Sequence, residues 1–140
     1  MIRLHATCID CKGHGVLITG RSGCGKSDLA LRLIDRGARL VSDDYTEVEV
    51  IDGRLVGRAP REIAGLIEVR GLGILPIAAV PQSNIVVHIV LDMDVPRLPE
   101  QALTTNIAGI AVPSFALAGL EPSAPIKLEM LLTRILEENA

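Results

Sequence analysis

The stretch that decides the fold is residues 20–27, Gly20-Arg21-Ser22-Gly23-Cys24-Gly25-Lys26-Ser27. A short apolar run, residues 16–19, precedes it and ends at the first glycine, as a buried strand would. In residues 27–36, apolar side chains recur at helical spacing, and Gly37 follows in the position that ends a helix. A Gly-x-x-x-x-Gly-Lys-Ser turn between a strand and a helix is a specific sign of a phosphate-binding loop.

Residues 20–27 are called the phosphate loop here, and each part of the loop can contribute to binding phosphate. Its glycines allow a tight turn that directs backbone N–H groups inward. The helix contributes its positive N-terminal end, and Lys26 adds a full charge for the β- and γ-phosphates. The Ser27 hydroxyl suits Mg²⁺. We therefore predict binding of a nucleoside triphosphate with Mg²⁺. The candidate nucleotide-binding residues are Gly20, Arg21, Ser22, Gly23, Cys24, Gly25, Lys26 and Ser27.

An acidic pair, Asp43 and Asp44, follows the next apolar strand candidate, Arg39–Ser42. Two carboxylates at a strand end can divide the work of phosphoryl transfer, one accepting the proton of an attacking hydroxyl and the other supporting the metal. The pattern also fits a solvated turn, because Asp is common after strands. The residues by themselves leave both explanations open.

The composition indicates one domain over residues 1–140. Apolar residues make up 49% of the chain, and the aromatic ones are Tyr45 and Phe115 alone. The core must therefore be aliphatic, and no aromatic platform is offered for stacking bases of a single strand. With a net charge of −3 and no basic stripe, binding of DNA or RNA is not expected.

Two stretches without charged residues, 71–91 and 101–120, are long enough to raise the question of a membrane span. Prolines and polar side chains interrupt both, so buried strands of a soluble sheet explain them better. Residues 1–10 lack the basic start and apolar run of a secretory signal. Three cysteines cannot form a fully paired disulfide framework, which favours a reduced, cytoplasmic setting.

The remaining periodicity predicts an α/β fold: a mostly β mixed sheet with few helices, one of them directly behind the phosphate loop. A hairpin is expected around Asp52 and Gly53, and a helix over residues 126–138. Further strand candidates are residues 2–7, 39–42, 66–69, 85–91 and 107–112.

Three segments in order extend the loop into a family resemblance. Residues 66–74, Leu-Ile-Glu-Val-Arg-Gly-Leu-Gly-Ile, closely resemble the signature segment of the HPr kinase/phosphorylase family. Residues 36–44 resemble that family's strand and acidic pair, and His5 stands at its histidine position, correctly spaced from the loop. The resemblance covers roughly residues 5–92.

This resemblance implies a P-loop kinase core similar to that of phosphoenolpyruvate carboxykinases. It also implies ATP- and Mg²⁺-dependent phosphorylation of a serine on the carrier protein HPr, within a phosphotransferase-system relay. The reverse reaction, in which phosphate removes the group and pyrophosphate is released, is expected less, because the segment tied to it is reduced to residues 124–128. The chain resembles short forms with the catalytic domain alone, of α-proteobacterial type, in a family that commonly forms hexamers.

The resemblance also assigns roles by position. Asp43 would be the general base for the serine hydroxyl, and His5 would lie beside that carboxylate. The residues with implied roles are Asp43, His5, Lys26 and Arg97 in catalysis, and Ser27 and Glu68 as Mg²⁺ ligands.

Several other features have plainer explanations. The run His5, Cys8, Cys11 and His14 suggests zinc, but it is one continuous segment, and a spacing of three on strands sends neighbours to opposite faces. A redox pair should open a helix, whereas these cysteines lead into a turn. His88, in an apolar strand candidate, is expected to be a hydrogen-bonded core residue.

Two functions other than a protein-serine kinase stay open. A non-catalytic nucleotide sensor would bind ATP without turnover, and its affinity for a partner would depend on the nucleotide. A P-loop small-molecule kinase would not need a protein-docking surface, for which residues 70–74 are the candidate.

Overall fold

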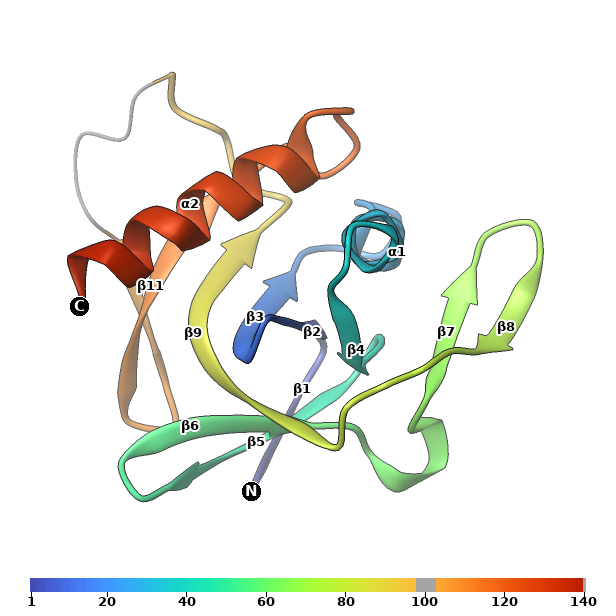
Figure 1. Cartoon of the computed structure of the whole chain (residues 1–140), viewed down its shortest axis with the longest axis horizontal. Coiled ribbons are helices and arrows are strands. Elements are labelled where there is room, and N and C mark those ends of the chain that lie inside the picture. Colours follow the sequence, from blue (N-terminus) through green and yellow to red (C-terminus); the bar gives the residue numbers. More distant parts are fainter. Residues whose placement is uncertain (98–102, 140) are drawn as a thin grey trace.

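Strands dominate the chain in the computed structural model, which describes residues 1–97 and 103–139 (Figure 1). Within these residues the helices are α1 (Lys26–Asp35), α2 (Ala124–Glu138) and the 3-10 turn η1 (Arg61–Ile63). The strands are β1 (Ile2–Leu4), β2 (Thr7–Cys11), β3 (His14–Thr19), β4 (Arg39–Ser42), β5 (Thr46–Ile51), β6 (Arg54–Arg58), β7 (Leu66–Val69), β8 (Gly73–Pro76), β9 (Gln82–Val90), β10 (Leu103–Ile107) and β11 (Ile110–Ala116). The prediction of a mostly β mixed sheet with few helices is confirmed.

The curved strand β9 joins the sheet together (Figure 1). Its first residues, 82–84, pair antiparallel with β6, and residues 85–90 pair parallel with β3. Its last residues also pair parallel with β11. The strand order is β1-β5-β6-β9-β3-β2-β4, and the β10–β11 hairpin attaches to β9. This curvature lets one strand support both the hairpins and the strand that leads into the phosphate loop.

Alternation along β3 divides the buried side chains into two clusters. Val16 and Ile18 pack with the apolar faces of α1 and α2, whereas Leu17 packs on the other face with β4, β5 and β6. The helix predicted over residues 126–138 is confirmed as α2, and its Leu128 and Leu132 are buried in the first cluster. Both faces of β3 are thus covered, which fixes the strand that ends at the loop.

The helix behind the loop, α1, begins and ends close to the predicted residues. Gly37 has a φ of 111°, Ala38 N donates to Leu33 O at 3.0 Å, and Gly37 N donates to Ile34 O at 3.0 Å. This is the Schellman arrangement, in which a glycine with positive φ satisfies the last carbonyls. The chain then turns directly into β4, which carries the acidic pair at its end.

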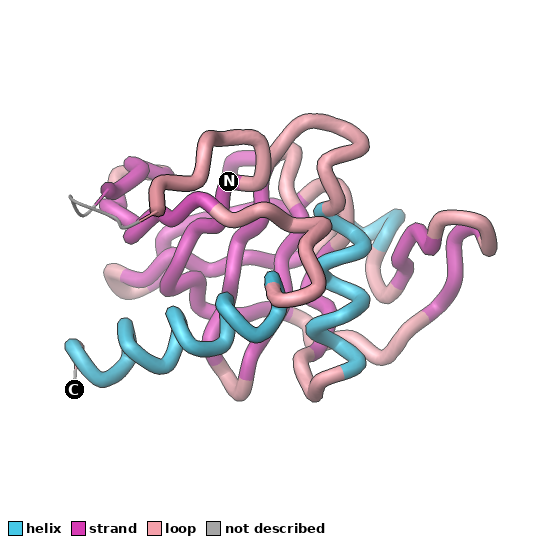
Figure 2. Tube along the Cα trace, turned by 90° about the horizontal axis from the view of Figure 1, so that it is seen from above, coloured by secondary structure: helices cyan, strands magenta, loops and turns pink. Residues whose placement is uncertain are grey.

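The hairpin of β7 and β8 stands apart from the main sheet, as Figures 1 and 2 show from two directions. Ile67 is buried among core residues, so the base of the hairpin is attached to the core. At its tip, Leu72 and Ile74 are 71% and 68% exposed. The hairpin therefore reaches outward from a buried base.

Three expectations about strands need correction. The strand predicted over residues 107–112 is wrong, because Ala108 and Gly109, with φ values of 52° and 89°, form the turn between β10 and β11. Residues 2–7 divide into β1 and the start of β2. The sequence did not predict β8.

Within the described residues, no helix is both long and apolar enough to cross a membrane, and the uncharged stretches supply β8 to β11.

Candidate functional site

The phosphate loop joins β3 to α1, as predicted, and it is tightly packed at Gly20 and Gly25, near its two ends. Gly25 has a φ of 98° and is the N-cap of α1, where no side chain caps the helix. A Cβ at Gly20 would lie 2.4 Å from Cys24 Sγ, so the loop has room only for hydrogen there. The first-turn N–H groups of α1 are therefore left without a side-chain cap and suit an anion.

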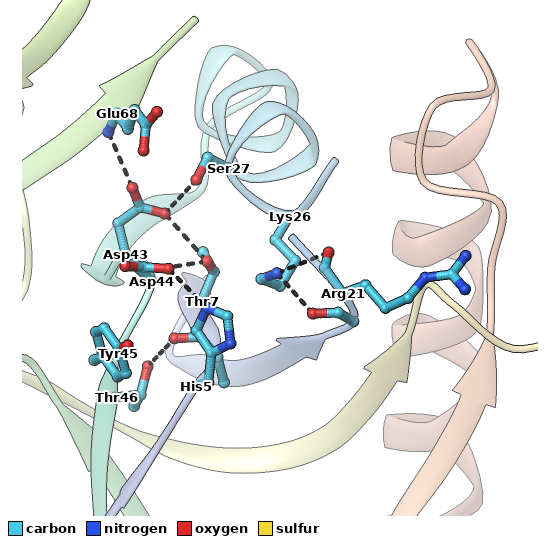
Figure 3. Close-up of polar contacts among 12 residues, drawn as sticks. His5, Thr7, Arg21, Lys26, Ser27, Asp43, Asp44, Tyr45, Thr46 and Glu68 are labelled. Carbon is cyan, nitrogen blue, oxygen red and sulfur yellow. Dashed lines mark hydrogen bonds and ion pairs between the residues drawn. The ribbon is translucent and has the colours of Figure 1, made fainter. Parts of the chain in front are cut away.

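Lys26 folds back over the loop that precedes it (Figure 3). Its side chain is 7% exposed, and Nζ donates to Gly20 O at 2.7 Å and to Arg21 O at 3.2 Å. Arg21 N in turn donates to Asp92 Oδ2 at 3.0 Å, which ties the loop to the end of β9. The ammonium group of Lys26 thus lies inside the phosphate loop, where we expect it to bind phosphate.

Asp43 is the buried centre of the polar cluster, at 5% exposure (Figure 3). Its Oδ1 accepts hydrogen bonds from Ser27 Oγ at 2.6 Å and Thr7 Oγ1 at 3.1 Å, and its Oδ2 accepts one from Glu68 N at 2.9 Å. These donors come from α1, β2 and β7. A single carboxylate therefore connects the loop hydroxyl, the main sheet and the protruding hairpin. The explanation of the acidic pair as only a solvated turn is wrong for Asp43.

Asp44, the second carboxylate of the pair, is hydrogen-bonded to His5. Asp44 has a φ of 68°, which turns the chain sharply after Asp43. His5 Nε2 donates to Asp44 Oδ1 at 2.9 Å, and the His5 ring lies 5.1 Å from the ring of Tyr45. The resemblance implied His5 beside Asp43. The hydrogen bond that His5 makes goes to Asp44, the next residue, and a role of His5 toward Asp43 stays a prediction. Thr7 lies between the two, since its Oγ1 also accepts from Asp44 N at 3.2 Å.

A pocket of about 610 Å³ brings the phosphate loop, Asp44 and the hairpin together, and Asp43 lies just behind its lining residues Ser27 and Glu68. Its lining residues are Ser22, Gly23, Gly25, Lys26, Ser27, Asp28, Leu31, Asp44, Glu68, Val69, Arg70 and Leu120. The side chain of Glu68 lies above Asp43 and near Ser27 in Figure 3. The hydroxyl and carboxylate oxygens here are the hard ligands that Mg²⁺ prefers, and Mg²⁺ commonly keeps waters and phosphates as its other ligands. The residues present therefore fit the metal that the sequence predicts.

Arg97 has no contact with this cluster among the described hydrogen bonds and pocket-lining residues. It is exposed in the segment that follows β9, and the pocket lining in the described residues does not include it. Sequence reasoning also missed Thr7, Asp92 and Leu120. Asp92 could have been found from its place after a predicted strand, but Thr7 and Leu120 reach the site only through tertiary packing.

His88 is a buried, hydrogen-bonded residue, as predicted, and of the two cysteines Cys8 is buried and Cys11 half-buried. His88 is hydrogen-bonded to Thr19 Oγ1 at 2.6 Å and to Ser114 Oγ at 3.0 Å, and burial lowers its pKa. Cys8 and Cys11 pack on opposite faces of β2. Burial raises the pKa of both thiols, that of Cys11 to about 12, so neither is poised for thiolate chemistry.

The model of the family described as "HPr Serine kinase C-terminal domain" matches residues 1–120. The chain belongs to this family. A solved structure described as the Hpr(Ser) kinase/phosphatase from Coxiella burnetii is similar to it, with a TM-score of 0.84 at 32% identity. That similarity covers 99% of this chain and 94% of the other. The predicted family and its kinase core are thereby confirmed.

Two curated relatives in the HPr kinase family extend the match along the chain. The HPr kinase/phosphorylase of Limosilactobacillus reuteri is 37% identical over an alignment of 150 positions, which covers 98% of this chain and 45% of that protein. The HPr kinase/phosphorylase of Clostridium tetani is 38% identical over 122 residues, covering 79% of this chain and 40% of that protein. The chain thus spans less than half the length of these relatives. A catalytic-domain-only form is consistent with this span, and the α-proteobacterial type stays a prediction.

Proposed function

We propose that this chain is an ATP- and Mg²⁺-dependent kinase that phosphorylates a serine of an HPr-like phosphocarrier protein in a phosphotransferase-system relay. The observation that carries the proposal is the short bond from Ser27 Oγ to the buried carboxylate of Asp43, 2.6 Å long. This bond joins the phosphate loop to an acidic residue that follows β4, the next strand in the chain. Phosphoryl transfer needs both parts within one site.

Ser27 and Glu68 are the proposed Mg²⁺ ligands, with Asp43 supporting the Ser27 hydroxyl. Mg²⁺ held there would neutralise negative charge that develops on the phosphates during transfer. When the Ser27 oxygen faces a metal through a lone pair, its hydrogen can still be donated to Asp43, so the bond of the free chain is compatible with the loaded site. Lys26 would exchange its hydrogen bonds to the loop carbonyls for hydrogen bonds to phosphate.

Asp43 is the proposed acceptor of the serine proton. A carboxylate has about four lone-pair sites, two on each oxygen. The Oδ1 of Asp43 already accepts two hydrogen bonds, whereas its Oδ2 accepts only the one from Glu68 N. One site on Oδ2 therefore remains for the hydroxyl of an incoming serine. His5 and Asp44 would assist as a neighbouring hydrogen-bonded pair that borders this point.

Three parts of the proposal rest on the family resemblance and not on the pocket: the role of Arg97, the docking segment and the oligomeric state. Arg97 is proposed to assist transfer, and an Arg97→Ala variant that transfers phosphate as fast as the unchanged chain would remove it from the account. The partner is proposed to dock around residues 70–74, next to the pocket-lining Glu68 and Arg70. Assembly into a homo-oligomer, a hexamer in the family, also stays a prediction.

The test incubates the purified protein with γ-labelled ATP, Mg²⁺ and HPr from the same organism. Label on the HPr serine, lost in an HPr variant with Ala at that serine, supports the proposal. ATP binding without labelled carrier overturns it in favour of a nucleotide sensor. Label on a small molecule of the cell extract, with HPr left unlabelled, favours a small-molecule kinase instead.

A further inference from the structure

The segment between β11 and α2, residues 117–123, comes back to cover one side of the phosphate loop; it is called the Leu120 loop here. Leu117 N donates to Val90 O at 3.1 Å, which holds its start against β9. Gly119 is buried against Leu91, and a Cβ at Gly119 would lie 2.8 Å from Leu91 Cδ1. The backbone of this loop is therefore packed tightly on the core.

The side chain of Leu120 is the exception. It is 65% exposed although its neighbour Gly119 is buried, and it lines the pocket. Its Cδ2 lies directly over Gly25, where an added Cβ would be only 2.7 Å away. A large apolar side chain thus stands uncovered at the N-terminus of α1, beside the loop that is shaped for phosphate.

Arg32 holds this arrangement from α1. Its Nη1 donates to Glu121 O at 2.9 Å, its Nη2 donates to Gly119 O, and its Nε donates to Asp28 Oδ2 at 2.9 Å. The guanidinium therefore donates hydrogen bonds to the backbone carbonyls of the residues on either side of Leu120. Such a two-carbonyl contact uses the fixed fork of arginine, which lysine lacks.

The pocket lining combines charged and aliphatic side chains. Asp44 and Glu68 are acidic, and Glu68 and Val69 belong to the hairpin. Leu31, on α1, and Leu120 are the other apolar side chains of the lining. Neither Tyr45 nor Phe115 lines the pocket among the described residues. An aliphatic wall is the apolar surface that remains.

We propose that Leu120, with Leu31, forms the wall that receives the base of the nucleotide, and that Arg32 is a positioning residue that holds Leu120 in place. The inference rests on the proposed nucleotide binding and adds where the base lies. Ligand sites combine apolar walls with a few polar groups that fix orientation. Here the loop would supply the polar part for the phosphates, and Leu120 and Leu31 would supply the apolar part.

The test is calorimetric binding of two Mg²⁺-loaded ligands, ATP and inorganic tripolyphosphate, which share the phosphate chain and differ in the base and ribose. For Leu120→Ala we expect an ATP dissociation constant about tenfold higher, because the base would no longer rest on the leucine side chain, and tripolyphosphate binding within about twofold. Met130→Ala is the matched control, since this apolar side chain on α2 is similarly exposed, does not line the pocket and should leave both ligands unchanged.

Arg32→Ala should give the same selective loss for ATP, whereas a merely structural role would weaken both ligands alike. Unchanged ATP binding in Leu120→Ala, or equal losses for both ligands, would overturn the inference while the proposed kinase function stands. If the unchanged chain binds neither ligand, the proposed function itself fails.

Discussion

The phosphate-loop side of the site and the β7–β8 hairpin are built in opposite ways. The loop follows β3, whose two faces are both buried, and its lysine is folded into its own backbone. The hairpin pairs with no other strand in the described part of the chain, and every residue of β8 is exposed. One hydrogen bond, from Glu68 N to Asp43 Oδ2, links the hairpin to the acidic pair.

This difference suggests a division of labour. Rigid, fully packed elements are suited to hold phosphate and metal, because precise geometry depends on locked neighbours. A protruding hairpin with an uncovered apolar tip is suited to meet a second protein. Changes on the two sides should therefore affect different measured quantities, nucleotide binding on one and use of the carrier on the other.

The largest effect is expected on the rigid side, from Lys26→Met. The variant keeps an unbranched side chain but loses the charge that would bind phosphate, so transfer should fall about 10²- to 10³-fold and ATP should bind more weakly. Kinetics and calorimetry measure the two effects. Lys12→Met, at an exposed turn residue, is the control and should change neither. Unchanged ATP affinity in Lys26→Met would contradict the role of the loop.

The boundary between the two regions is tested by Glu68→Gln. Losing a metal-binding carboxylate should raise the Mg²⁺ concentration needed for half-maximal transfer by about 10- to 100-fold. A titration of activity with Mg²⁺ at saturating ATP measures it. Glu62→Gln, at an exposed glutamate of η1, should leave the titration unchanged. The same Mg²⁺ requirement in both variants would remove Glu68 from the metal site.

The hairpin tip is tested by the double change Leu72→Ser and Ile74→Ser. Both side chains are exposed, so the free energy of unfolding should change by no more than about 0.5 kcal/mol for each. The KM for the carrier should rise about tenfold, while the ATP dissociation constant stays the same. Met130→Ser, equally exposed on α2, is the control. A raised ATP dissociation constant with an unchanged KM for the carrier would contradict the proposed division between the two sides.

The smallest effect concerns His88, which supports the end of β3 through Thr19. Burial lowers the pKa of His88, so the unfolded chain takes up a proton before the folded chain does as the pH falls. Stability should therefore decline as the pH drops below the usual histidine value of about 6.5, and level off below the lowered pKa. Denaturant unfolding should show a shallower acid decline for His88→Gln than for His14→Gln. Equal declines in the two variants would contradict this.

The local part of the fold was predictable because its signals lie within a few residues. Gly37 ends α1 through its positive φ, and Asp52 and Gly53, with φ values of 52° and 76°, form the expected hairpin turn. The turn at Ala108 was hidden because alanine rarely takes a positive φ, so its residue type gave no warning. The hairpin partner β8 was missed for a related reason, since Gly73–Pro76 has neither alternation nor burial.

The site divides in the same manner. The phosphate loop is one contiguous stretch of sequence and the acidic pair is another, so both could be recognised from the sequence. The pairing of His5 with Asp44 instead of Asp43 depends on the φ of 68° at Asp44, which the sequence does not signal. Leu120 comes to the site from 95 residues beyond Gly25 in the chain, and tertiary contacts bring it there: the packing of Gly119 against Leu91 and the hydrogen bonds from Arg32.

The central claim is that the buried carboxylate turns a nucleotide-binding loop into a kinase, and Asp43→Asn tests it most directly. ATP affinity and transfer of γ-labelled phosphate to HPr are measured on the same preparation. We predict an ATP dissociation constant within about threefold of the unchanged chain, and transfer reduced by about 10³-fold or more. Transfer at the full rate in Asp43→Asn would contradict the account.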